Sequence, residues 1–148
     1  MAGKKKFLVL GILGIVTLYF TSTTVLHGLT AVESAENVES VPWLPDTASN
    51  ISYSKNFNRR YFEFDVSEPA FCEWAKDYSI SEISEPFHIS RYAIMIDNPD
   101  SVDVDNDPRY TAVIANGLSA SHTQSNHGGY SLAFDRDSDR AYFRSSSR

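Results

Sequence analysis

The chain opens with a short basic segment and then a long run of residues without charge. Lysines occupy positions 4–6, and the next charged residue is Glu33. A bilayer core about 30 Å thick needs roughly 20 helical residues, and this run is longer than that. Lysines ahead of an apolar run are typical of an export signal or signal anchor. The pattern predicts a transmembrane helix within residues 1–31, with a cytoplasmic N-terminus and the rest of the chain outside.

Retention or cleavage of this segment decides between an anchored and a secreted protein. Cleavage needs small residues at the last and third-last positions before the cut, and cuts after Ala31 or Ala35 match this poorly because Leu29 and Glu33 then hold the third-last position. The hydroxyl residues at 21–24 interrupt the apolar run without forbidding a membrane span. We therefore expect a retained single-pass anchor, and secretion after signal cleavage is the alternative.

The residues that follow this segment are acidic and show no periodic alternation of apolar and polar positions. Residues Val32–Ser40 are small and polar, and prolines follow at positions 42 and 45. Such composition is typical of solvated chain, and a residue before proline is disfavoured in a helix. We expect an acidic spacer over residues 32–43 and an extracytoplasmic domain over residues 44–148.

The clearest alternation of apolar and polar positions lies over residues 61–66. Phe62, Phe64 and Val66 fall on one side of this segment, and Glu63 and Asp65 fall on the other. Period-two alternation predicts a half-buried strand, with the two carboxylates facing solvent.

A helix is predicted directly after this strand. Ser67 is a good N-cap, Pro69 suits the first turn, and Val66 and Phe71 have the spacing of a hydrophobic staple. The apolar residues then recur with helical period at Phe71, Trp74, Ala75 and Tyr78.

The remaining pattern is rich in β-forming residues. Strands are predicted over Ile89–Ile96 and Tyr110–Ala115, and the end of the chain resembles a hairpin, Tyr130–Phe134 and Arg140–Arg144 around an Asp/Ser-rich turn. The expected fold class is α+β: an N-terminal transmembrane helix, then a small, mostly antiparallel sheet packed by one main helix.

Charge is distributed unevenly along the 148 residues. The net charge is −6, but three of the 13 basic residues precede the apolar run and all 19 acidic residues follow it, so the outer part carries −9. An acidic domain repels phosphate backbones and anionic headgroups, which disfavours nucleic-acid binding and docking on lipid. The single cysteine, Cys72, excludes an internal disulfide, and because it lies far from the apolar run it also excludes a lipoprotein anchor.

The acidic loop before residue 108 carries the strongest hint of a metal site. Asp103, Asp105 and Asp107 alternate like the first ligands of a calcium loop. Pro108 replaces the required glycine and Ile114 replaces the bidentate glutamate, so an EF-hand is excluded. An irregular calcium site on these three aspartates is one hypothesis, and a solvated polar loop is the simpler one. No other cofactor is expected.

Other candidate residues have ordinary interpretations beside the functional ones. His122 and His127 could bind zinc, but their spacing does not match a helix face and a third ligand is missing. Cys72 is expected to be a buried, inert thiol. Asn50 begins a glycosylation triplet that matters only in a eukaryotic host. Asp135, Asp137 and Asp139 are expected to be turn residues.

Three stretches of the outer part resemble small exported bacterial domains of unknown function. They are the opening Leu44–Tyr53, the strand and helix over residues 61–74, and the closing Phe134–Phe143. The resemblance covers roughly residues 44–144 and implies a bacterial envelope setting, with no activity and no site residues to carry over.

Function is constrained more by location than by chemistry. No Gly-x-Ser-x-Gly elbow or glycine-rich phosphate loop is present. We expect a membrane-anchored, non-enzymatic domain that binds or scaffolds an envelope protein through an exposed sheet surface or edge. The alternatives are a calcium- or small-ligand-binding exported module, and a hydrolase whose site is assembled from distant residues such as His122 or His127.

Overall fold

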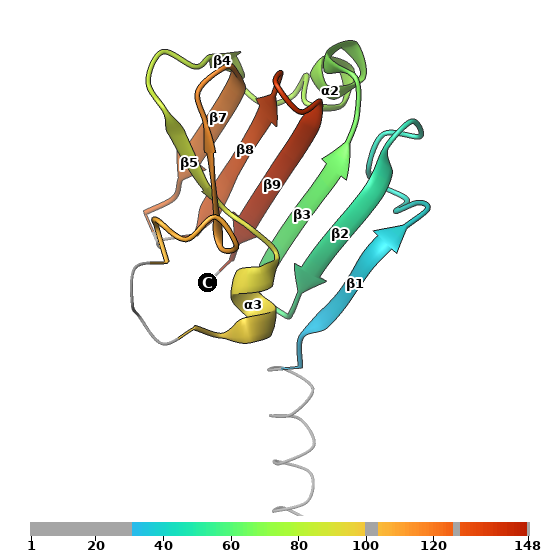
Figure 1. Cartoon of the computed structure of the whole chain (residues 1–148), viewed down its shortest axis with the longest axis vertical. Helices are drawn as coiled ribbons and strands as arrows, with labels where there is room; N and C mark the ends of the chain where they lie inside the picture. Colours follow the sequence, from blue (N-terminus) through green and yellow to red (C-terminus); the bar gives the residue numbers. More distant parts are fainter. Residues whose placement is uncertain (1–30, 100–103, 126–127, 148) are drawn as a thin grey trace, which may run out of the picture. The chain divides into compact units, whose positions relative to one another are not determined.

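The computed structural model of the protein describes residues 31–99, 104–125 and 128–147. This part of the chain forms a seven-stranded sheet, a two-stranded sheet and two short helices (Figure 1). Every strand pair within it is antiparallel, so the predicted α+β class with a mostly antiparallel sheet is confirmed. The elements are β1 Glu33–Val38, β2 Ser49–Lys55, β3 Arg59–Asp65, α2 Glu68–Trp74, β4 Ser81–Glu82, β5 Phe87–Ser90, α3 Ala93–Asp97, β6 Thr111–Ile114, β7 Gly117–Thr123, β8 Gly129–Asp135 and β9 Arg140–Ser146.

Two meanders meet in the middle of the large sheet. Its strand order is β1-β2-β3-β9-β8-β7-β4. The consecutive strands β1-β2-β3 and β7-β8-β9 join where β3 pairs with β9, and β4 is added at the outer side of β7. That pairing runs without a shift from Arg59 opposite Ser146 to Asp65 opposite Arg140. The joint therefore places two strands from opposite ends of the domain at its centre.

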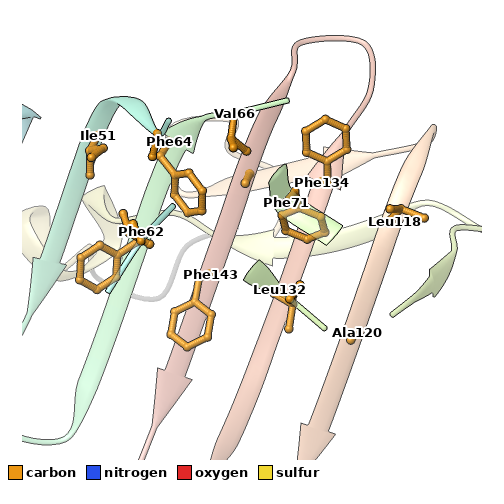
Figure 2. Close-up of a cluster of buried hydrophobic side chains, with 14 residues drawn as sticks. Ile51, Phe62, Phe64, Val66, Phe71, Leu118, Ala120, Leu132, Phe134 and Phe143 are labelled. Atoms are coloured by element: carbon orange, nitrogen blue, oxygen red, sulfur yellow. The ribbon is translucent and has the colours of Figure 1, made fainter. Parts of the chain in front are cut away.

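One face of this sheet carries the main hydrophobic core. Phe64, Leu132 and Phe134 are fully buried there, and Phe71 from α2 stacks on Phe134 with ring centroids 5.3 Å apart (Figure 2). Buried aromatic rings remove large apolar areas from water, so this layer supplies most of the driving force for folding.

The helix α2 forms where the sequence predicts it, although it is shorter. Ser67 is the N-cap residue with an extended backbone, and Pro69 lies in the first turn. Val66 and Phe71 are both part of the core, as the staple requires. No side-chain capping bond is made by Ser67 in the described structure, and the helix ends at Trp74. Tyr78, predicted on the helical stripe, follows the helix and packs against the same core.

The second face of the sheet is also covered, contrary to the prediction of a half-buried strand. Ile89 from β5 and Ile114 from β6 pack there against Ala133 and Tyr142. Glu63, expected to face solvent, retains only 1 % of its accessible surface. The cause is tertiary, because the covering segments lie more than 20 residues further along the chain.

Three further segments differ from the expectation. The predicted spacer over residues 32–43 contains β1, which pairs with β2 from Glu33 opposite Lys55 onwards. The strand predicted over Ile89–Ile96 ends at Ser90, and α3 takes the remainder. β4 and β7 were not predicted, because β4 is very short and β7 is rich in glycine, serine and alanine.

The predicted transmembrane segment, residues 1–31, falls outside the described residues except for Ala31. Among the residues that are described, the helices are too short and too polar to cross a bilayer. The anchor therefore stays a prediction from sequence.

Candidate functional site

A group of aromatic rings crosses the core-bearing face of the sheet. Tyr53 stacks on Phe62 with centroids 5.3 Å apart, and Trp43 meets the same ring edge-on at 4.7 Å. Trp43 also lies 5.2 Å from Phe143 and 5.8 Å from Trp74. Three separate elements, β3, α2 and β9, therefore converge on Trp43 through ring contacts.

The segment that carries Trp43 is held rigidly. The indole N–H of Trp74 donates to the Trp43 carbonyl oxygen at 3.0 Å, and the Leu44 amide donates to the Val41 carbonyl oxygen at 3.0 Å. Leu44 is buried in the core, whereas Trp43 keeps 39 % of its surface exposed. A large ring is thus presented to solvent on a fixed backbone, which lowers the entropy lost on binding.

Beside Trp43 the sheet surface is hollowed into a groove of about 450 Å³. β1, the segment after it, β2 and β3 all contribute side chains. The lining residues are Val38, Ser40, Val41, Pro42, Trp43, Tyr53, Lys55, Arg60 and Phe62. We refer to this site as the aromatic groove.

Two cations stand at the aromatic groove, and only one of them is neutralised. The Lys55 ammonium pairs with Glu33 at 3.0 Å, and Tyr53 donates its hydroxyl to the same carboxylate at 2.9 Å. The hydrogen bond from Lys55 has the larger effect on Glu33 and the one from Tyr53 the smaller; both lower the pKa of its carboxylate, which therefore stays ionised. Arg60 has no ion pair within the described structure. The groove therefore offers apolar walls and one uncompensated positive charge.

The described lining of the aromatic groove combines apolar and aromatic side chains with the polar groups of Ser40, Lys55 and Arg60. Exposed aromatic rings beside an arginine are the residue types that dominate binding at protein interfaces.

A second polar cluster is buried on the opposite face, around Glu63. The Arg91 guanidinium reaches the Glu63 carboxylate at 2.8 Å, the Tyr92 amide donates to it at 3.2 Å, and Arg140 lies 3.4 Å away. Hydrogen bonding to Glu63 raises the pKa of Arg91, so this guanidinium stays charged. These donors occupy the Glu63 carboxylate. Because Arg140 belongs to β9, and Arg91 and Tyr92 lie between β5 and α3, the cluster joins β3 to both of these parts of the chain.

Two of the three aspartates of the calcium hypothesis lie among the described residues. Asp105 is exposed, and the Asp107 carboxylate accepts the Arg109 amide at 2.8 Å inside a turn. Asp103 lies outside the described residues. Among the residues that are described, no three potential ligands come together around a metal position. The calcium site is therefore still a prediction, without geometric support from Asp105 or Asp107.

The histidines give a similar result. His122 lies on β7 beside Tyr130, with ring centroids 5.8 Å apart, and His88 is exposed on β5. His127 is not among the described residues, so the zinc hypothesis stays untested. The carboxylate of Asp135 accepts bonds from the Asp137 amide and the Ser138 hydroxyl, which confirms the predicted role of this stretch as a hairpin turn.

Cys72 packs against the core from α2 and is half-buried. Burial raises the pKa of its thiol, so its thiolate fraction at pH 7 is lower than that of a free cysteine. We expect iodoacetamide to alkylate Cys72 more slowly than a cysteine peptide at pH 7, and at the peptide's rate once urea unfolds the domain. Equal rates in the folded state would contradict an inert thiol.

Sequence analysis missed the aromatic groove because its residues come from three short stretches. Trp43 falls at the end of the predicted acidic spacer over residues 32–43. The signal that could have found the groove is the alternation that puts Tyr53 with Lys55, and Arg60 with Phe62, on one side of adjacent strands.

Comparison of the chain with protein-family models, with curated proteins and with solved structures gave no match. The geometry of the aromatic groove and the sequence of the N-terminal segment are therefore the basis for assigning a function to this chain.

Proposed function

We propose that the chain is a membrane-anchored, extracytoplasmic, non-enzymatic domain that binds another envelope protein through the aromatic groove. The observation that carries this proposal is the exposed Trp43 ring, held on a fixed backbone beside the unpaired Arg60. Tryptophan and arginine are the residue types that most often dominate the binding energy of protein interfaces.

The location rests on the N-terminal sequence. The lysines at positions 4–6 and the uncharged run behind them favour a single membrane span with the domain outside. The resemblance to small exported bacterial domains supports an envelope setting. Secretion after signal cleavage would leave the aromatic groove and its partner chemistry unchanged.

The chemistry of the aromatic groove indicates what the partner presents. An apolar or aromatic side chain fits between Trp43 and Tyr53, where it would be buried against rings. A carboxylate next to that side chain would pair with Arg60. We therefore expect the partner to supply an extended segment in which an apolar residue neighbours an acidic one.

Charge reversal at the aromatic groove tests this function. Arg60→Glu keeps the exposed position polar but repels an acidic segment, so capture of the partner from detergent-solubilised envelopes by the full chain should fall about tenfold or more. The matched control is Arg59→Glu, because this substitution makes the same charge change on the opposite side of β3. In detergent solution this control should capture as much partner as the unmodified chain.

Two results would overturn the proposal. One is equal capture by Arg60→Glu, Arg59→Glu and the unmodified chain, which would place binding outside the aromatic groove. The other is an absence of any specific partner in envelope extracts. Far-UV circular dichroism of both variants checks that the fold is retained, as expected for exposed positions.

A further inference from the structure

The basic residues of this acidic domain are divided into two groups. Most have a carboxylate partner within 4.0 Å: Lys55, Lys76, Arg91, Arg109, Arg136 and Arg140. Among the described residues, the lysines and arginines without an ion pair are Arg59, Arg60 and Arg144. Arg144 lies over the Tyr61 ring instead, at 6.0 Å.

These three arginines share one end of the sheet. Arg59 begins β3, and Arg144 lies opposite Tyr61 near the end of β9. The Ser147 amide donates to the Asn58 carbonyl oxygen at 2.8 Å, which ties the end of β9 to the β2–β3 turn. β1 begins at this same end, since Glu33 pairs with Lys55 just before the turn (Figure 1). The chain therefore enters the domain where the unpaired positive charge gathers.

Exposed apolar side chains lie at the same end. Phe57 occupies the tip of the β2–β3 turn and is 76 % exposed, the highest value among the large hydrophobic residues described. Ile96 is 44 % exposed on α3. α3 is held beside the end of β2 because Ser54 donates its hydroxyl to the Tyr92 carbonyl oxygen at 2.6 Å.

Three described carboxylates at this end have partners. Glu33 pairs with Lys55, Glu36 accepts the Tyr92 hydroxyl at 2.7 Å, and Asp97 lies 3.5 Å from Arg109. At the other end, the β8–β9 turn presents the exposed Asp137 and Asp139. Along the strand direction, the sheet thus has one end with unpaired arginines and exposed apolar side chains, and an opposite end with exposed aspartates.

We infer that the basic end, defined by Phe57, Arg59, Arg144 and Ile96, docks on the headgroup surface of an anionic phospholipid bilayer. Phe57 inserts its ring between headgroups, and the guanidinium groups bind lipid phosphates. This inference rests on the proposed membrane anchor, which sets the domain near the bilayer. The domain is acidic when its charge is averaged over the whole surface. Salt screens electrostatic interactions over a Debye length of about 8–10 Å, so acidic residues at the far end of the domain have little effect on docking at the basic end.

The short connection makes this docking efficient. The uncharged run of the sequence continues to the residue before Glu33, where β1 begins. An anchor ending there leaves almost no free chain, so the basic end stays at high effective concentration beside the membrane. Weak contacts, which would not recruit a soluble protein, then suffice to orient the domain.

The test uses the full chain reconstituted in vesicles with and without phosphatidylglycerol. Cys72→Ser removes the native thiol, and an environment-sensitive fluorophore is attached at Asn58→Cys, next to Phe57. The control label at Thr47→Cys lies just before β2, so the length of this strand, roughly 20 Å, separates it from the β2–β3 turn. Spin-labelled lipid headgroups should quench the label at position 58 in phosphatidylglycerol vesicles, and leave the label at position 47 bright.

Charge and salt supply the matched comparison. Arg59→Glu with Arg144→Glu leaves the aromatic groove and Arg60 intact, and should reduce quenching at position 58 by about tenfold or more. High salt should reduce it as well. Quenching that is equal in zwitterionic vesicles, or unchanged by the double variant, would overturn the inference.

Retention of the chain after alkaline extraction of the vesicles separates the two proposals. A chain that is retained but unquenched at position 58 has an anchor and no docking. A chain that is washed away contradicts the anchor and the docking together.

Discussion

Replacing Glu63 with glutamine is expected to destabilise the domain by about 3 kcal/mol, although the side chain keeps its shape. Arg91 and Arg140 would then keep their charge on a covered face of the sheet without the carboxylate between them. Desolvating a cation without its partner costs several kcal/mol, whereas the glutamine oxygen offsets only part of this. Urea titration of the full chain in detergent, followed by Trp43 and Trp74 fluorescence, measures the free energy of unfolding.

Asp65→Asn is the control for this experiment. Asp65 pairs with Arg140 in the same cluster, but it is partly exposed, so its removal should cost about 1 kcal/mol or less. If Glu63→Gln lowered the free energy of unfolding as little as Asp65→Asn, the buried cluster would not stabilise the packing on the second face of the sheet. Coupling between Glu63→Gln and Arg91→Gln in a double-mutant cycle would localise the effect to their contact.

Gly117→Ala is expected to cost about 3 kcal/mol, because the new methyl group has no room. A Cβ atom at Gly117 would lie 1.8 Å from the Phe134 carbonyl oxygen, and this oxygen belongs to the backbone of a central strand. The φ angle of 157° is also one that side-chain-bearing residues rarely adopt. The Gly117 carbonyl accepts the Ile83 amide, so the distortion would loosen β4 as well.

Thermal unfolding by circular dichroism compares this variant with Ser121→Ala on the same strand. Ser121 is exposed, so its change should stay within about 0.5 kcal/mol. If Gly117→Ala unfolded at the same temperature as Ser121→Ala, this result would contradict the close approach of β7 and β8 at Gly117.

Prediction from sequence succeeded where one short segment contains all the information. The alternation around Phe62 and Phe64 set the strand, and Ser67, Pro69 and Phe71 set the start of α2. Each of these signals acts over a few residues, through side-chain direction and backbone geometry, so no distant contact was needed.

Prediction failed where a distant segment changes the environment. Glu33–Val38 has the composition of solvated chain, yet it forms a strand because β2 supplies backbone partners and Lys55 pairs with Glu33. The stretch after Ser90 favours a strand by propensity, but Arg91 turns toward Glu63 and the chain continues as α3. In both places a long-range contact outweighs a weak local preference.

The candidate sites followed the same division. The spacing of Asp103, Asp105 and Asp107 drew attention because it is visible in one stretch of sequence. The aromatic groove needs Trp43, Tyr53 and Arg60 from separate stretches, and only the pairing of β2 with β3 makes them neighbours. Sequence spacing therefore favours sites built from one loop over sites built across strands.

By itself, the sequence determined the order of its strongest elements and the antiparallel α+β class, because hydrophobic period acts locally along the chain; the anchor stays a prediction from the same kind of local signal. The tertiary structure alone decided that both faces of the sheet are covered, that Glu63 is buried, and that Trp43 and Arg60 line one groove. It also decided that Arg59, Arg60 and Arg144 gather at one end of an acidic domain. The physical reason is that strand pairing sets which residues become neighbours, and this pairing depends on the packing of the whole domain.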